Sequence, residues 1–290
     1  MAKDAQKKKS KQKSKRTTLK INQLKNTSRV EEQVRQLRPI DDIMFHKLME
    51  DDEVCQEVLQ VVMEDPNLKV LDVRPQEDIK SLQGRSVRLD VFCTLGDGRF
   101  CNIEVQRSNN DNHFKRVRYN EACITANSTN TGEDFKDVPD VVMIYIAEFD
   151  PFHAKRTIYH CYTVCEETGQ KVNNGLLEIY LTTTGQDEKT LIKELMNCFL
   201  QTEVNHPSFP KLSNRMKVLK KSEGGLNEMC KVMEEFAKEI KSEAVLDVQK
   251  ETIATLIRNG LDFKGLTTLL TNYPQDLIAE VYEEMRVSDD

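Results

Sequence analysis

The chain has 290 residues, enough for one large domain or for a core domain with an appendage, and its composition is not that of a disordered protein. Residues 1–38 hold 13 Lys and Arg against 3 Asp and Glu, whereas the rest of the chain holds 29 against 45. An acidic body repels nucleic-acid phosphates, which argues against a protein that simply coats DNA and suits a local site where bound cations offset clustered carboxylates.

The N-terminal segment is strongly basic. Residues 1–37 are expected to form a disordered arm, because KKKSKQKSKR and its surroundings contain almost no large apolar side chains. Such an arm either holds phosphates electrostatically or acts as a solubilising tail. No apolar stretch follows the lysines, and no run approaches the roughly 18 apolar residues of a membrane span. We therefore expect no signal peptide, no membrane contact and a cytoplasmic protein.

From Arg38 the pattern predicts an α/β core over residues 38–185. Apolar residues at helical spacing predict two short helices in DDIMFHKLMED and EVCQEVLQVVME. A strand is then predicted in KVLDVRP, followed by a polar loop over about 75–84. The next segments, SVRLDVFCTL and RFCNIEVQ, alternate apolar and polar residues and meet at Gly96-Asp97-Gly98, a strong signal for a β-hairpin.

Helical spacing resumes after the hairpin, in DNHFKRVRYNEACITANS. The apolar run DVVMIYIAEF predicts a buried strand, and two further strands are expected in RTIYHCYTV and GLLEIYLTT. Residues 186–290 form an expected helical extension, with Gly260 as a C-cap and a last pair of helices around Pro274. The long charged part of this extension either pairs with a second copy, giving a homodimer, or packs on its own domain.

The predicted hairpin brings two carboxylates together. With the turn centred on Asp97, antiparallel partners have residue numbers that sum to 194, so Asp90 lies opposite Glu104 with Cβ atoms about 4.5–5.5 Å apart. Gln106 shares their face, with Arg88 opposite it, while the other face is apolar and forms the core. Two opposed acids repel unless a cation lies between them or basic neighbours pair with them. Carboxylate oxygens together with water are the ligands of a magnesium site.

Four segments in order carry a resemblance to a known family: DDIMFHKLM, RLDVFCTLGDGRFCNIEVQ, RVRYNEA and DVVMIYIAEFDPF. They resemble the PD-(D/E)XK nuclease superfamily, and more narrowly the recombination-promoting nuclease and transposase family of bacteria. The resemblance covers about residues 38–185 with specific motifs and continues more loosely through the helical tail. It implies a restriction-endonuclease-like α/β fold, in which helices flank a central mixed sheet.

The resemblance also implies which residues bind metal. Asp90 and Glu104 match the acids that hold the ion, and the backbone carbonyl of Val105 is a further expected ligand. Such folds often offer another acid, for which Asp42 and Glu77 are the candidates. Asp42 is preferred because it lies in the opening motif of the family, although either acid is more often a helix N-cap or a loop charge.

Gln106 occupies the motif position where most of the superfamily has lysine. It is expected to act beside the two acids by orienting water, but an amide carries no positive charge. That charge is expected from the following helix, where Lys115, Arg118 and Tyr119 fall at i, i+3 and i+4 on one face. With Arg88 they are candidates for phosphate binding; the alternative is that these side chains only solvate an exposed helix.

The implied activity is Mg²⁺-dependent hydrolysis of phosphodiester bonds in DNA, with Mn²⁺ as a substitute and a link to recombination or mobile elements. Under this reading the protein is an endodeoxyribonuclease. The alternative is a non-catalytic DNA-binding or assembly protein that keeps the nuclease fold. Gln106 in place of lysine and the acidic body favour that alternative.

Histidines and cysteines give no sign of a zinc site. The eight cysteines are dispersed without a CxxC pair, so we expect reduced thiols that mostly lie in the core. The histidines stand singly and form no ligand pair, which favours surface or core roles for His46, His113, His153, His160 and His206.

Overall fold

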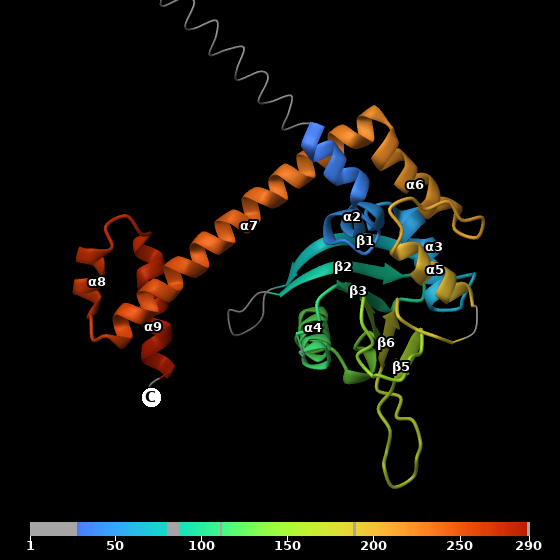
Figure 1. Ribbon diagram of the computed structural model, residues 1–290. Coiled ribbons are helices and arrows are strands. Elements are labelled where there is room, and N and C mark those ends of the chain that lie inside the picture. Colours follow the sequence, from blue (N-terminus) through green and yellow to red (C-terminus); the bar gives the residue numbers. More distant parts are fainter. Residues whose placement is uncertain (1–27, 80–86, 111, 188–189, 289–290) are drawn as a thin grey trace, which may run out of the picture. The chain divides into compact units, whose positions relative to one another are not determined.

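The computed structural model describes residues 28–79, 87–110, 112–187 and 190–288 (Figure 1). The chain forms two compact units, Met1–Cys230 and Lys231–Asp290. Of the arm predicted over residues 1–37, residues 1–27 lie outside the described residues. Residues 28–36 are helical, so the expected disorder does not extend through residue 37.

A six-stranded mixed sheet is the centre of the first unit, with the strand order β1-β2-β3-β4-β6-β5 (Figure 1). Strands β3, β4 and β6 run parallel, and β1, β2 and β5 pair antiparallel with their neighbours. The mixed sheet with flanking helices confirms the expected restriction-endonuclease-like α/β fold. The strands are β1 (Val70–Ile79), β2 (Val87–Leu95), β3 (Phe100–Gln106), β4 (Val141–Ala147), β5 (Ile158–Cys161) and β6 (Leu176–Thr182).

Helices cover both faces of this sheet. The thiol of Cys93 on β2 contacts Cys55 of α3, whereas the adjacent Phe92 packs in a cluster with Val117 of α4. Because neighbouring strand residues point to opposite faces, α3 and α4 lie on opposite sides of β2. The helices of this unit are α2 (Asp42–Met49), α3 (Asp52–Val62), α4 (His113–Ser128), α5 (Leu191–Phe199) and α6 (Pro210–Lys221), with a short 3₁₀ helix, η1 (Phe135–Asp137).

Helices α5 and α6 lie beyond residue 185, where the sequence analysis placed a boundary, yet they belong to the first unit. Phe199 of α5 is fully buried, and its ring lies 6.3 Å from that of Phe45 on α2. Leu212 and Met216 of α6 are also buried. These apolar side chains complete the core on the α3 side of the sheet, which explains why the compact unit continues to Cys230.

The hairpin has the register predicted from its turn. Val91 pairs with Ile103 and Phe92 pairs with Asn102, so the numbers of paired residues sum to 194. Gly98 has a φ of 90°, a value that glycine adopts without the steric cost of a side chain. The turn chemistry therefore fixed the alignment of the two strands.

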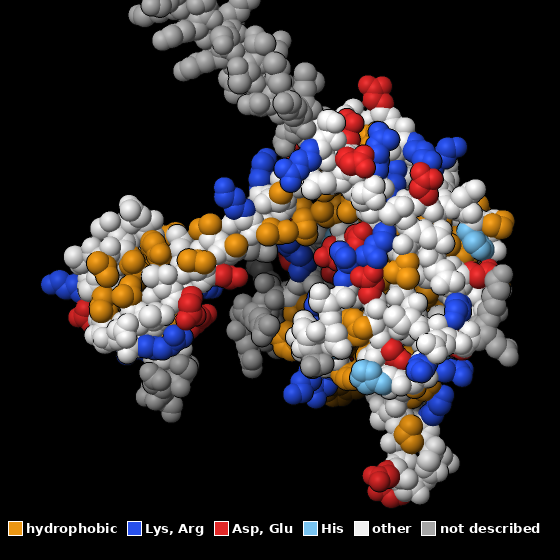
Figure 2. Space-filling view, in the orientation of Figure 1, with side chains coloured by type: hydrophobic (Ala, Val, Ile, Leu, Met, Phe, Trp, Pro, Cys, Tyr) orange, Lys and Arg blue, Asp and Glu red, His pale blue; other side chains and the backbone are white. Residues whose placement is uncertain are grey.

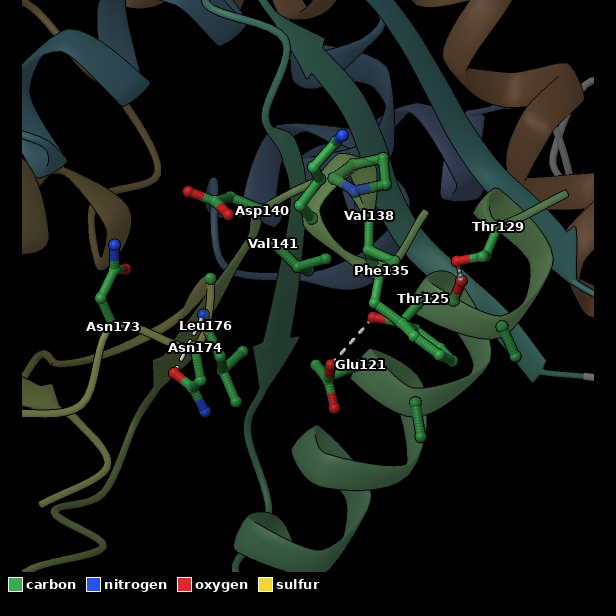
Figure 3. A pocket seen from close by; sticks show the side chains of 15 residues that line it. Glu121, Thr125, Thr129, Phe135, Val138, Asp140, Val141, Asn173, Asn174 and Leu176 are labelled. Carbon is green, nitrogen blue, oxygen red and sulfur yellow. Dashed lines mark hydrogen bonds between the residues drawn. The ribbon is translucent and has the colours of Figure 1, made fainter. Parts of the chain in front are cut away.

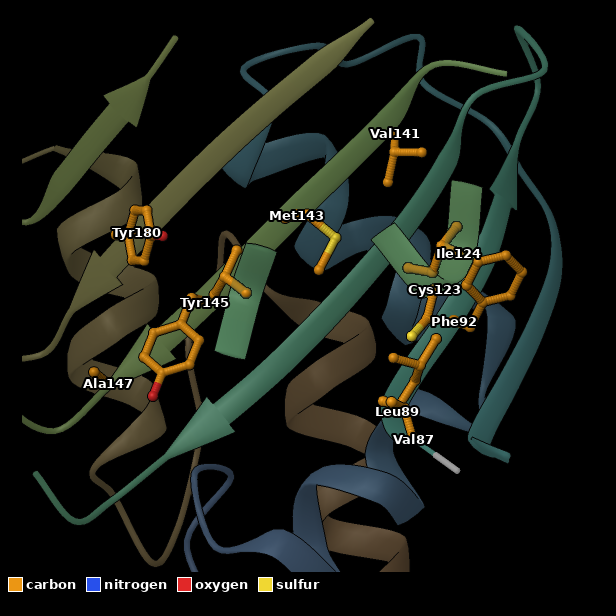
Figure 4. Packing of buried hydrophobic residues seen from close by; sticks show 11 residues of the cluster. Val87, Leu89, Phe92, Cys123, Ile124, Val141, Met143, Tyr145, Ala147 and Tyr180 are labelled. Carbon is orange, nitrogen blue, oxygen red and sulfur yellow. The ribbon is translucent and has the colours of Figure 1, made fainter. Parts of the chain in front are cut away.

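A second apolar cluster lies between α4 and the sheet (Figure 4), on the face from which Glu104 contacts Asn120 of α4. From the alternation of apolar residues in the hairpin, an apolar core was expected on the opposite face only. Leu89 was expected on that opposite face but belongs to the α4-side cluster, so the regular alternation changes at Asp90. On the neighbouring strand β1, the residue across from Asp90 is Gln76. Its φ of 53° departs from strand geometry at the same point.

Strand β1 runs through Ile79, although a polar loop was predicted from about residue 75. Ile79 pairs with Val87 at the far end of the ladder with β2. Pairing with a neighbouring strand therefore overrides the polar local sequence. The rest of that predicted loop, residues 80–84, lies outside the described residues.

Lys220 of α6 is a buried lysine that binds three backbone carbonyls. It is 3% exposed, and its ammonium donates hydrogen bonds to the carbonyl oxygens of Arg35, Leu37 and Thr202. Burial lowers the pKa of Lys220 to about 8. The side chain ties the segment before α2 to the loop after α5.

Replacing Lys220 by methionine is expected to lower the free energy of unfolding by about 2 kcal/mol, because the three carbonyls lose their buried donor. Lys217→Met is the matched control, since Lys217 is exposed on the same helix. Urea unfolding of the two variants measures the difference. Equal stability of both variants would contradict a structural role for Lys220.

The second unit is helical and has a small core of its own. Helix α7 (Glu223–Arg258) starts in the first unit and continues into the second, where α8 (Phe263–Leu269) and α9 (Gln275–Ser288) follow. Gly260 has a φ of 87° directly after α7, which confirms the predicted C-cap. The buried residues of this core are Ile253, Leu266, Leu277, Ile278 and Val281.

The middle of α7 exposes aliphatic side chains, which Figure 2 shows as hydrophobic atoms along the helix. Ile240, Val245 and Val248 are at least half exposed. Among the described residues, no helix is both long and apolar enough to cross a membrane.

Candidate active site

Strands β2 and β3 separate where Asp90 and Glu104 stand. The regular pairing ends at Val91 and Ile103, and beyond it side-chain carboxylates take the place of ladder hydrogen bonds. The N–H of Val105 donates to Oδ2 of Asp90 at 2.9 Å, and the N–H of Asp90 donates to Oε1 of Glu104 at 3.4 Å. The structure thus brings the two predicted acids together at the open end of the hairpin.

Glu104 is held inside the protein by three side-chain donors. It is 1% exposed, and its Oε1 accepts from Nδ2 of Asn102 at 2.9 Å and from Nδ2 of Asn120 at 3.2 Å. Its Oε2 accepts from Nη2 of Arg116 at 3.2 Å. Burial and the negative charge of Asp90 outweigh these donors and raise the pKa of Glu104 to about 7.

Gln106 is joined to Glu104 through Arg116. Nη1 of Arg116 donates to Oε1 of Gln106 at 3.2 Å, and Nε2 of Gln106 donates to the carbonyl of Ser108 at 3.0 Å. One guanidinium therefore binds both motif side chains. It supplies a fixed positive charge at a motif that has no lysine.

The residues predicted to bind phosphate lie at exposed positions. Lys115, Arg118 and Tyr119 lie on the exposed side of α4. Arg88 is also exposed, and its Nε lies 3.2 Å from Oδ1 of Asp78 on β1. The side of α4 that faces β3 carries Arg116 and Asn120 instead.

Sequence reasoning did not single out Arg116, Asn120 or Asn102. A signal for Asn120 was present, because it stands one turn after Val117 and one turn before Cys123 and Ile124, which are apolar residues of the same predicted helix. A polar residue on the buried stripe of a helix usually has a specific hydrogen-bond partner. Here that partner is Glu104.

Helix α2 places Asp42 and His46 next to the hairpin. Nε2 of His46 lies 3.8 Å from Oδ1 of Asp90. Asp42 keeps contact with solvent, but the protein around it partly desolvates its carboxyl. This desolvation is the larger cause of its raised pKa, and the negative charge of Asp90 is the second. Glu77 instead pairs with Arg74 at 3.1 Å. Of the two further acids considered, the structure therefore brings Asp42 toward Asp90.

Four alternating charges hold the start of α2 against the sheet. Arg38 binds Asp41 at 3.0 Å and Glu148 at 2.6 Å. Arg107 binds the same two acids, each at 3.0 Å. Since Arg107 follows β3 and Glu148 follows β4, this ring fixes the helix end that carries Asp42 to the ends of both strands.

The donor types fit a divalent cation, but the acids are not gathered around one. Within the described part of the chain, no three His, Cys, Asp or Glu side chains are grouped closely enough to hold a metal ion. The oxygens of Glu104 point to Asn102, Asn120 and Arg116, so binding requires Glu104 to give up one of these donors. The repulsion between Asp90 and Glu104 is the conflict that a cation removes.

A separate cavity of about 840 Å³ lies at the other end of the central strands (Figure 3). It is lined by Val141 and Leu176, the first residues of β4 and β6, and by the highly exposed Phe135. Glu104 pairs with Tyr145, four residues further along β4. The cavity therefore does not include the acidic site.

Comparison with known families identifies the family of this chain. A family model described as PD-(D/E)XK nuclease family transposase matches residues 39–254. No curated protein and no solved structure gave a match. The matched region contains the hairpin with Asp90, Glu104 and Gln106, and helix α4 with Arg116. The chain belongs to the PD-(D/E)XK nuclease family transposases.

Proposed function

We propose that this protein is a metal-dependent endodeoxyribonuclease that hydrolyses phosphodiester bonds, with Mg²⁺ as the expected ion and Mn²⁺ as a substitute. Nucleases of this superfamily typically use divalent metals. The observation that carries the proposal is the pair of carboxylates at the open end of the hairpin, with Arg116 bound to both Glu104 and Gln106. A role in recombination or on mobile elements is part of the same proposal.

In this proposal the carboxylates of Asp90 and Glu104 and the carbonyl of Val105 hold the ion, with Asp42 as a further acid. When bound, a divalent cation lowers the pKa of a coordinated water and offsets the negative charge of the transition state. Glu104 has to be ionised to take part, and its pKa of about 7 means that neutral or alkaline pH favours this form.

Gln106 and Arg116 act on the water and the phosphate. The amide of Gln106 can orient the attacking water, and the hydrogen bond from Arg116 fixes the rotation of that amide. The Arg116 side chain is 39% exposed, so its outer edge remains open to a phosphate oxygen. A guanidinium there stabilises the negative charge that grows in the transition state.

Residues around the site are proposed to contact the flanking DNA. Lys115, Arg118 and Tyr119 share the exposed side of α4, and Arg88 is an exposed residue of strand β2. On the face seen in Figure 2, basic and acidic side chains are interspersed over the first unit, so we expect local phosphate contacts.

We also propose that the protein is located in the cytoplasm and that it forms a homodimer through the helical extension.

One observation favours a non-catalytic DNA-binding or assembly protein. The carboxylate of Glu104 already has Asn102, Asn120 and Arg116 as donors without a metal. A buried acid satisfied in this way can serve the fold alone.

Incubation of supercoiled plasmid with the purified protein distinguishes the two functions. We expect nicking or linearisation in Mg²⁺ and in Mn²⁺ and none in EDTA, because the acids need a cation to act on the phosphate. Gel electrophoresis measures the cut products, and a gel-shift assay measures retained DNA. Retention without cutting in either metal would contradict the nuclease and support the binding protein.

A further inference from the structure

His46 has a buried ring nitrogen that no described residue satisfies. Its Nε2 has no hydrogen-bond partner and almost no contact with solvent. The nearest acidic oxygen, Oδ1 of Asp90, lies 3.8 Å away, which is too far for a hydrogen bond. Buried polar atoms in native proteins are nearly always paired, so an unpaired one next to a functional acid calls for a ligand.

The other nitrogen of the ring is held by Gln76 of β1. Its Nδ1 lies 3.2 Å from Nε2 of the Gln76 amide. The two ends of an amide are interchangeable in shape, so with Oε1 turned toward the ring the amide accepts the proton of Nδ1. Nε2 of His46, which lies 3.8 Å from Oδ1 of Asp90, then keeps its lone pair. A second hydrogen bond of this kind is what orients histidines that bind metals.

Gln76 has a backbone conformation that is unfavourable for glutamine. Its φ of 53° is in the left-handed region, which is unfavourable for a residue with a side chain and favours glycine. It also stands between the paired positions Pro75–Val91 and Glu77–Leu89, directly across from Asp90. A glutamine in this conformation gains its amide contact with His46 at a backbone cost.

We propose that Nε2 of His46 is a ligand of the metal ion at this site, beside Oδ1 of Asp90. The inference rests on the proposed function, because it assigns a further ligand to the same ion. Two metal–ligand bonds of about 2.1 Å each can join atoms up to about 4.2 Å apart, so a single ion can reach both atoms across the separation of 3.8 Å. His46 lies one helical turn after Asp42, so α2 presents both side chains to the hairpin.

An imidazole ligand changes which ion the site prefers. Mg²⁺ is bound mainly by oxygen, whereas imidazole nitrogen suits transition metals. A site with His46 therefore selects Mn²⁺ or a later transition metal over Mg²⁺, although a purely carboxylate site shows less preference. The preference for a transition metal would therefore come from His46 and not from the carboxylates.

Electron paramagnetic resonance of bound Mn²⁺ tests the proposal without relying on activity. We expect full-length wild-type protein to bind Mn²⁺ at least about tenfold more tightly than Mg²⁺, with a histidine ¹⁴N coupling in the echo-modulation spectrum. His46→Gln should lose this coupling and bind Mn²⁺ about tenfold more weakly, with Mg²⁺ affinity changed less than threefold. His160→Gln, which replaces an exposed histidine, is the matched control and should keep both properties.

The outcomes separate this proposal from the proposed function. Mn²⁺ bound to wild type without nitrogen coupling, or a coupling that survives in His46→Gln, overturns the role of His46 and leaves the nuclease proposal standing. Absence of Mn²⁺ binding, or binding unchanged in Asp90→Asn, overturns both. If His46→Gln does not fold, wild type labelled with ¹⁵N-histidine replaces it: His46 is the histidine nearest Asp90, so a coupling that changes with the isotope is the expected result, and a spectrum without such a change overturns the role of His46.

Discussion

Replacing Glu104 by glutamine is expected to lower metal-dependent DNA cleavage by about 10³-fold, and Asp90→Asn is expected to have a similar effect. Each change keeps the size of the side chain and removes one of the two charges that hold the ion. In Glu104→Gln, the amide oxygen can still accept hydrogen bonds from Asn102 and Asn120, so the fold should persist. The rate of nicking of supercoiled plasmid, measured with saturating Mg²⁺, checks the expectation.

The matched control for this experiment is Glu133→Gln. Glu133 is exposed and binds only Asn130 among the contacts described, so the same chemical change there should leave the rate within about twofold. Circular dichroism confirms that all variants are folded. A Glu104→Gln protein that is folded and cuts at the wild-type rate would show that this carboxylate is not part of the active site.

The central pair of acids was accessible from sequence because local rules determine it. The turn at Gly96-Asp97-Gly98 fixes the register of the hairpin, and the alternation of apolar residues aligns Asp90 with Glu104. Both strands were also bounded by clear turn signals. Short-range chemistry was therefore enough to place the two carboxylates opposite each other.

The surroundings of the acids depend on contacts between distant segments, which local patterns do not determine. Lys115 and Arg118 were preferred on α4 for their charge and spacing, but the rotation of the helix is set by packing of Val117 against the sheet. That packing turns Arg116 inward to Glu104. The approach of His46 to Asp90 likewise joins residues from α2 and β2. No spacing within one segment encodes such a contact.

In EDTA, the free energy of unfolding is expected to fall by about 3 kcal/mol between pH 4.5 and pH 8 through Glu104 alone. The pKa of Glu104 is about 7 in the folded protein, against an ordinary value of 4.5. Below pH 4.5 the carboxyl is protonated in both states, so the full stability is present. Between these values only the folded state keeps the proton, so rising pH removes stability until the folded carboxyl has ionised.

Glu104→Gln should remove this pH dependence, because the amide resembles the protonated acid at every pH. Urea unfolding at pH 4.5 to 8 in EDTA should show a smaller slope for this variant and a higher stability than wild type at pH 8, whereas Glu133→Gln should follow wild type. Added Mn²⁺ should then restabilise wild type at pH 8 and affect Glu104→Gln little, because a ligand stabilises only the state that binds it. Parallel pH curves for wild type and Glu104→Gln would contradict the buried, repelled carboxylate. If the two pH curves differ, and Mn²⁺ removes the difference in stability at pH 8, then the Glu104 carboxylate that destabilises the metal-free protein is also a ligand of the ion.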